Sequence, residues 1–193
     1  MKIERRFADF QKIEVRKGED GTARISGYPA VFNSLSQDLG GFKERIAPGA
    51  FARTIKEQDV RALFNHDSNF ILGRTAAGTL RLAEDERGLR MDLDLPDTQV
   101  ARDLAVSMER GDVSGGSFGF NLHTDGDSWQ DSDEGTIRTL NSVRLFDVGP
   151  VVYPAYPDTD VSMAQRSLEA WIESHEVEPL RMLNERLYRM LSI

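Results

Sequence analysis

The sequence contains no cysteine and only three histidines in 193 residues. Without cysteine the chain can form no disulfide, no thiolate metal site and no thiol nucleophile. A three-histidine metal site would require His66, His123 and His175 together, and these residues stand in unrelated sequence contexts. We therefore expect neither a metal ion nor any other cofactor.

Long apolar runs and an excess of basic residues are also missing. No segment approaches the roughly 20 apolar residues that span a bilayer, and the basic residues near Met1 are not followed by the apolar core of a signal peptide. The net charge of −8 leaves no broad basic surface for nucleic acid. We expect a cytoplasmic protein with no membrane or nucleic-acid partner.

Alternation of apolar and polar residues predicts a strand-rich chain. It indicates a hairpin over residues 12–28 and further strands over 60–64, 71–75, 79–82, 89–95, 113–122 and within 136–152. The acidic segment 125–135 does not fit a calcium loop, because Gln130 stands where the EF-hand pattern needs glycine. We predict a solvated hairpin loop there.

Helical spacing is confined to a few segments. It predicts helices over 48–55, 97–110 (with Asp97 as the cap), 163–175 and 179–193. The chain is thus predicted to be mixed α+β and β-rich, with one domain over residues 1–161 and a helical tail over 162–193.

Residues Gly111–Phe120, with the sequence Gly-Asp-Val-Ser-Gly-Gly-Ser-Phe-Gly-Phe, carry the strongest indication of chemistry. Strand alternation places Phe118 and Phe120 on one face and Ser117 on the other. Glycines beside a serine let a substrate approach and leave backbone N–H donors close to the hydroxyl. Ser117 is the candidate nucleophile. Ser114 is an alternative nucleophile. The alternative to catalysis is a structural role, in which these small residues let backbones pack closely at a strand end.

A nucleophilic serine needs a base and an orienting carboxylate. His66 follows a predicted strand and is the candidate base, although it could equally be a surface-loop histidine. Asp147 lies in an otherwise apolar strand, where a carboxylate is costly unless it is paired. It could orient His66, or it could form an ion pair with Arg144 or another arginine.

Six segments in order resemble a known family. They are Gly27–Phe32 (Gly-Tyr-Pro-Ala-Val-Phe), Pro48–Phe51 (Pro-Gly-Ala-Phe), Leu63–Asp67 (Leu-Phe-Asn-His-Asp), Leu72–Thr75 (Leu-Gly-Arg-Thr), Gly116–Phe120 (Gly-Ser-Phe-Gly-Phe) and Val151–Tyr156 (Val-Val-Tyr-Pro-Ala-Tyr). Over residues 24–157 the chain resembles the HK97-type prohead (procapsid maturation) proteases of tailed bacteriophages, a serine peptidase family.

The resemblance implies a fold like that of herpesvirus assembly proteases, with a closed or partly closed antiparallel β-barrel core and peripheral helices. It also implies His66 and Ser117 as catalytic residues. Asp147 would be the third member, at a position where relatives more often carry glutamate. Gly116 and Arg74 are candidates for holding the oxyanion or positioning the substrate.

The implied function is a serine endopeptidase acting inside the immature phage capsid, in the cytoplasm of the bacterial host. Its expected substrates and partners are the scaffold protein, the scaffold-like N-terminal region of the major capsid protein, and further copies of the protease itself. The helical tail would target or dock the enzyme, or be removed by self-cleavage. A non-catalytic capsid- or scaffold-binding module of the same fold is the alternative. An unrelated serine esterase would need a helix directly after Ser117, and Phe118–Leu122 predicts a strand.

Overall fold

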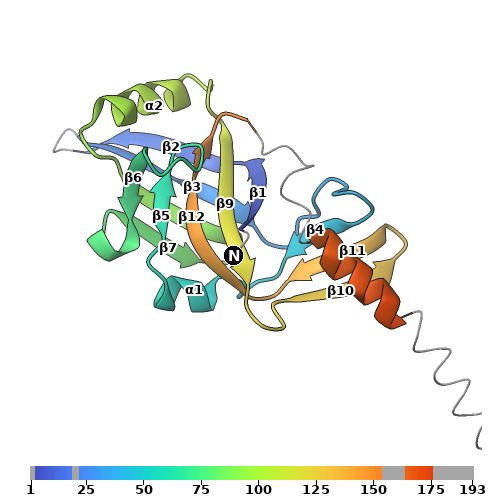
Figure 1. The fold of residues 1–193 in the computed structure, drawn as a ribbon. Coiled ribbons are helices and arrows are strands. Elements are labelled where there is room, and N and C mark those ends of the chain that lie inside the picture. Colours follow the sequence, from blue (N-terminus) through green and yellow to red (C-terminus); the bar gives the residue numbers. More distant parts are fainter. Residues whose placement is uncertain (1–2, 19–21, 154–163, 176–193) are drawn as a thin grey trace, which may run out of the picture.

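The structure is a computed structural model of the chain and describes residues 3–18, 22–153 and 164–175. Strands dominate these residues and form three sheets, with helices at their margins (Figure 1). The prediction of a mixed α+β, strand-rich fold is confirmed. The three sheets do not close on one another, so the barrel part of that prediction is not confirmed.

The five-stranded sheet and the loop that joins two of its strands carry all the candidate site residues. Its spatial order is β1 (Glu4–Asp9), β9 (Gly115–Leu122), β12 (Val143–Val151), β5 (Arg61–Leu63) and β6 (Ile71–Arg74). β12 runs parallel to β5, and the other neighbours are antiparallel. β1 and β6 are therefore the two edges, and β9 lies one strand inside (Figure 1).

A four-stranded antiparallel sheet shares its apolar core with the first sheet. It consists of β2 (Gln11–Lys17), β3 (Ala23–Val31), β8 (Gly88–Asp94) and β7 (Leu80–Glu84). The predicted hairpin over 12–28 is the β2–β3 pair. Alternation on β8 buries Leu89, Met91 and Leu93 completely, in one cluster with Phe118 and Phe120 of β9. That core fixes the inner face of β9.

Helices flank these two sheets. They are α1 (Ala52–Glu57), the single 3₁₀ turn η1 (Thr75–Ala77) and α2 (Gln99–Glu109). α2 was predicted, but its cap is Thr98, whose side chain accepts a hydrogen bond from the Ala101 N–H at 3.4 Å. Asp97 pairs instead with Arg102. α1 begins at Ala52 rather than residue 48, because residues 48–51 form turns.

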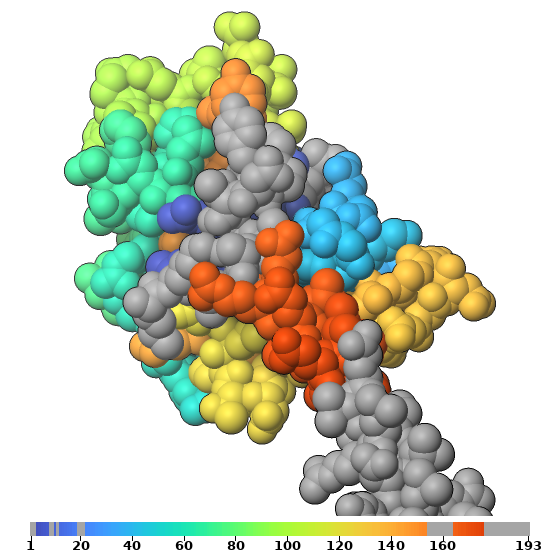
Figure 2. All heavy atoms as spheres, turned by 45° about the vertical axis from the view of Figure 1, so that its right-hand side comes forward, coloured from blue at the N-terminus to red at the C-terminus, as the bar shows by residue number. Residues whose placement is uncertain are grey.

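The third sheet extends to one side of the body. It contains β10 (Asp127–Ser132), β11 (Gly135–Leu140) and β4 (Lys43–Ile46), with β11 antiparallel to β10 and parallel to β4. Helix 164–175 lies against this sheet and against the loop that precedes β4 (Figure 2). Ala164 and Leu168 pack with Phe42, and the Trp129 indole N–H donates to Ser167 Oγ at 3.1 Å.

Two segments differ from the sequence prediction. The segment predicted as an acidic loop is largely strand β10. Most of its polar residues are exposed to solvent, while Trp129 packs on Phe42 and on helix 164–175. Strand β1 was not predicted at all. Its residues Glu-Arg-Arg-Phe do not alternate in hydrophobicity, because charged side chains occupy its buried face. The helix expected over 163–175 is present over 164–175, and the one over 179–193 lies outside the described residues.

A buried ionic cluster joins β1 to the third sheet. Arg138 is only 1% exposed and contacts Glu4 at 2.8 Å, Glu44 at 3.0 Å and Asp127 at 2.7 Å. Arg6 Nε contacts Glu44 at 2.6 Å. Burial opposes the charge of Arg138, yet these carboxylates raise its pKa above the ordinary value. The guanidinium groups therefore stay charged and hold β1 in place.

Candidate active site

Ser117 is the third residue of β9 and lies on the face opposite the core. Phe118 and Phe120 are buried on the other face, with ring centroids 5.3 Å apart, and Phe118 packs edge-on against Phe51 at 5.5 Å. A strand continues through Leu122 after the serine, so the strand–helix context of an esterase nucleophile elbow is absent here. The aromatic residues fix the backbone on which the hydroxyl is presented.

His66 lies in the tight loop between β5 and β6. Asn65 and His66 both have left-handed backbone conformations, with φ of 54° and 56°. Consecutive non-glycine residues in this region cost energy and persist only where the surroundings enforce them. The loop is held by Asn65 N–H to the Pro150 carbonyl at 3.0 Å and by Val152 N–H to Asn65 Oδ1 at 2.9 Å. These bonds to the end of β12 aim the imidazole back across the sheet.

Asp147 is directed toward His66 by an irregularity in β12. The pairing of β12 with β9 shifts register between Leu145 and Asp147, as in a β-bulge. Gly119 lies opposite, and a Cβ built on it would be 2.7 Å from Asp147 Oδ2, so glycine is required there for the carboxylate to fit. The alternative pair with Arg144 does not form, since the Arg144 Nε donates to Gln58 Oε1 at 3.2 Å.

The three side chains form one continuous hydrogen-bonded chain. His66 Nδ1 is hydrogen-bonded to Asp147 Oδ1, and His66 Nε2 is 2.6 Å from Ser117 Oγ. The His66 and Asp147 side chains are each 10% exposed. With the Nδ1 proton directed at Asp147, Nε2 is the acceptor that faces the serine hydroxyl. This arrangement can take a proton from Ser117 and keep the imidazole oriented.

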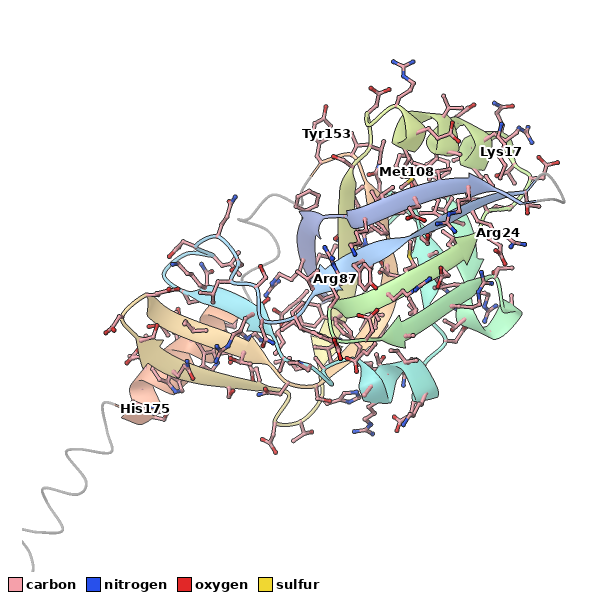
Figure 3. The ribbon with its side chains drawn as sticks, turned by 180° about the vertical axis from the view of Figure 1, so that it is seen from behind. Lys17, Arg24, Arg87, Met108, Tyr153 and His175 are labelled. Carbon is pink, nitrogen blue, oxygen red and sulfur yellow. The ribbon has the colours of Figure 1, made fainter. Side chains whose placement is uncertain are left out.

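The other predicted residues take no part in this hydrogen-bonded chain. Arg74 is on β6, separated from β9 by β5 and β12, and pairs with Asp59. Gly116 faces the core, where a Cβ would be 2.7 Å from the Phe10 ring, so packing already explains this glycine. Ser114 is exposed and precedes β9. Figure 3 shows His175 at the end of helix 164–175, at the opposite side of the molecule from α2.

Among residues 3–18, 22–153 and 164–175, no group of three or more histidine, aspartate or glutamate side chains is placed to hold a metal ion. Within the same ranges, no helix is long and apolar enough to cross a membrane. The chemistry of the Asp147–His66–Ser117 chain needs neither a metal nor a cofactor.

A profile of the family described as caudovirus prohead serine proteases matches residues 11–173. The chain belongs to this family. It is 35% identical over 121 residues to the prohead protease of Enterobacteria phage HK97, in an alignment that covers 60% of this chain and 50% of that protein. It therefore spans about half the length of that curated relative.

The fold of this chain resembles that of the capsid assembly protease of bacteriophage T4. The superposition has a TM-score of 0.55 and covers 78% of this chain and 97% of the T4 chain, at 14% sequence identity. At that identity the likeness concerns the fold alone. It fits an open, strand-rich α+β architecture.

Sequence reasoning missed two features of the site in this family member. The first is Gly119, whose missing side chain makes room for the Asp147 carboxylate. A glycine two residues after the serine was visible in the sequence, but its partner strand was not. The second is β1, whose Arg6 carbonyl accepts a hydrogen bond from Ser117 Oγ at 2.9 Å. No residue pattern indicated that contact, because it is made by the backbone.

Proposed function

We propose that this chain is a serine endopeptidase of phage capsid maturation, with Ser117 as nucleophile, His66 as general base and Asp147 as the residue that orients His66. One observation carries the proposal: the unbroken hydrogen-bonded chain from Asp147 through His66 to Ser117. Three elements far apart in sequence contribute one residue each. Membership of the prohead serine protease family supports the serine-peptidase part of the proposal.

The proposed reaction is acyl transfer in two steps. In the first, the Ser117 hydroxyl proton passes to His66 Nε2 while Oγ bonds to the substrate carbonyl carbon. His66 then gives this proton to the departing amine as the C–N bond breaks. In the second, a water molecule loses a proton to His66 and attacks the acyl-enzyme. His66 returns the proton to Ser117 Oγ, and the product carboxylate leaves.

The developing oxyanion requires hydrogen-bond donors. The backbone N–H of Gly116 remains our candidate, since it adjoins the nucleophile. Arg74 was the second candidate from the sequence, and for it to take part the pair with Asp59 would have to open. Removing one oxyanion donor typically lowers turnover by about 10²–10³-fold.

The proposed substrates are the scaffold protein, the scaffold-like N-terminal region of the major capsid protein, and the protease itself, cleaved inside the immature capsid. In this proposal residues 1–161 form the protease domain and residues 162–193 a docking or targeting tail. The packing of helix 164–175 on Phe42 and Trp129 supports a tail whose first part docks on its own domain. The structural neighbour from bacteriophage T4 is itself a capsid assembly protease.

A non-catalytic capsid-binding module is the second candidate function. The observation that favours it is the burial of Ser117, which is only 1% exposed. If the chain is such a module, replacing Ser117 or His66 should leave capsid maturation unchanged.

Co-expression with the cognate major capsid protein tests the proposal. Intact masses are compared for the wild type, Ser117→Ala and the neighbouring-serine control Ser114→Ala. We expect a shortened capsid protein with the wild type and with Ser114→Ala, and none with Ser117→Ala. Equal cleavage by the wild type and Ser117→Ala would exclude Ser117 as nucleophile. No cleavage by any of them under assembly conditions would favour the non-catalytic module.

A further inference from the structure

Ser117 is covered by the first strand of the chain. The residue is 1% exposed, although a nucleophile that attacks a protein must be reached by a peptide backbone. β1 pairs antiparallel with β9 from Glu4 opposite Phe120 to Asp9 opposite Gly115, with Phe7 opposite Ser117. Figure 1 shows β1 along the side of β9 that faces away from β12. An extended substrate that adds to this sheet edge would need the same position.

The contact between β1 and Ser117 opposes catalysis. Ser117 Oγ is 2.9 Å from the Arg6 carbonyl oxygen and 2.6 Å from His66 Nε2. A hydroxyl has one proton, so a bond donated to Arg6 is a bond withheld from the base. Oγ contacts the oxygen of that peptide group as a hydrogen-bond donor, whereas attack would require it to approach the carbonyl carbon. β1 thus occupies the site without being arranged for cleavage.

The side chains of β1 fit the glycine-lined face of β9. A Cβ built on Gly115 would be 2.3 Å from the Phe7 ring, and one built on Gly119 would be 3.3 Å from Ile3 Cγ2. Gly115, Ser117 and Gly119 share this face by alternation. The two glycines therefore leave room on either side of the nucleophile, which Phe7 fills over Gly115 and which Asp147 and Ile3 fill over Gly119. We call this face of β9 the substrate groove.

The opposite face of β1 is anchored by charge. Glu4 contacts Arg138 at 2.8 Å, and Arg6 contacts Glu44 at 2.6 Å. In contrast, Arg5 Nε is buried with no hydrogen-bond partner among the described residues, and such an atom costs stability. β1 is consequently held at the edge of the sheet by specific ion pairs. It also carries one unsatisfied polar atom, Arg5 Nε, which would gain water as a partner if β1 left the sheet.

We propose that β1 is an internal occupant of the substrate groove, which keeps the free chain latent until β1 leaves β9 and an extended segment of the substrate replaces it. This inference rests on the proposed function of Ser117. It assigns the edge of β9 as the substrate-binding strand. It also assigns the face formed by Gly115, Ser117 and Gly119 as the place where an apolar substrate side chain lies, as Phe7 does here.

The test measures how fast Ser117 reacts with a small probe. Diisopropyl fluorophosphate bonds to an accessible, activated serine with loss of fluoride, and intact mass reports the product. Two full-length variants loosen β1 at different contacts: Phe7→Ala empties the groove over Gly115, and Arg6→Met removes the anchor to Glu44. The control Ile71→Ala truncates an exposed apolar residue on β6, the other edge of the same sheet. Ser117→Ala shows whether labelling is specific, and circular dichroism checks that each variant is folded.

Phe7→Ala and Arg6→Met should each label at least about tenfold faster than the wild type. Loss of the contacts of a partly buried phenyl ring, or of a charged hydrogen bond, shifts the equilibrium between paired and released β1 by about that factor. Ile71→Ala should label at the wild-type rate, and Ser117→Ala should not label. Equal labelling of the wild type and both variants would overturn the inference while leaving Ser117 as a reactive nucleophile.

Absence of labelling in every folded variant would also overturn the inference, and the capsid co-expression assay then separates the two proposals. Ser117-dependent cleavage of the capsid protein would mean that only the inference on β1 is wrong. Absence of cleavage would mean that the proposed function is wrong as well.

Discussion

Gly119→Ala places one methyl group against the carboxylate that orients His66. The new Cβ would be 2.7 Å from Asp147 Oδ2 and 3.3 Å from Asp147 Cγ. Ordinary contacts of this kind begin at 3.4 Å, so the carboxylate must move by about 0.7 Å. Ile3 Cγ2, at 3.3 Å, can yield because it lies on an edge strand.

A shift of this size is larger than the roughly 0.5 Å within which catalytic groups must be held. A misplacement of about 1 Å can cost about 10²-fold in rate, so we expect cleavage of the capsid protein to slow by about that factor. The stability cost of adding a methyl group to a packed site is about 1–3 kcal/mol. For a domain of this size, each kcal/mol lowers Tm by about 2–4 °C, so we expect Tm to fall by about 2–12 °C.

The half-time of capsid-protein cleavage in co-expression, read by intact mass, measures the effect. Gly78→Ala is the matched control, since its site is open and its cost comes only from a φ of +72°. It should lower Tm without changing the cleavage half-time. Combining Gly119→Ala with Asp147→Asn should cost little more than Asp147→Asn alone, because both act on the orientation of His66. A folded Gly119→Ala protein that cleaves at the wild-type rate would refute the reasoning.

The remaining predictions concern stability. Arg138→Met leaves three carboxylates without the cation that they share, and two of them are almost fully buried. The free energy of unfolding, measured in urea, should fall by about 3–5 kcal/mol. An unchanged urea midpoint would contradict the role given to the ionic cluster. Asp59 accepts hydrogen bonds from Arg74 and from the Ala76 N–H, which lower its pKa from 3.8 to about 2. Its contribution to stability is therefore complete above about pH 4 and is lost as the pH falls toward 2. The difference in urea midpoint between the wild type and Asp59→Asn should stay constant from pH 7 to 5 and narrow below pH 4, and a difference that widened on acidification would oppose this assignment.

Much of the site could be predicted because its parts leave local patterns. The alternation around Ser117 placed the serine and the two phenylalanines on opposite faces of a strand, and the structure has them so. Asp147 could be singled out because a carboxylate in an apolar strand needs a partner. Whether that partner was His66 or Arg144 depended on a register shift in β12, which leaves no local pattern.

β1 and β10 could not be predicted for a different physical reason. Strand prediction relies on apolar residues alternating toward a core, and the buried face of β1 carries charges that are satisfied by residues more than 30 positions away. β10 pairs with the adjacent strand β11, but its one large apolar side chain, Trp129, packs on Phe42 and on helix 164–175 rather than on a hairpin partner. The side-chain contacts that stabilise β1 and β10 therefore come from distant parts of the chain and leave no local pattern.

The sequence by itself determined the strand-rich α+β class and the strand that presents Ser117, because both follow from periodicity. The cost of burying a carboxylate singled out Asp147, and the resemblance of the ordered motifs pointed to His66 and Ser117. Only the tertiary structure decided that His66 pairs with Asp147, that the sheets stay open, and that β1 covers Ser117. These outcomes depend on which distant strands become neighbours, and that is set by the packing of the whole core.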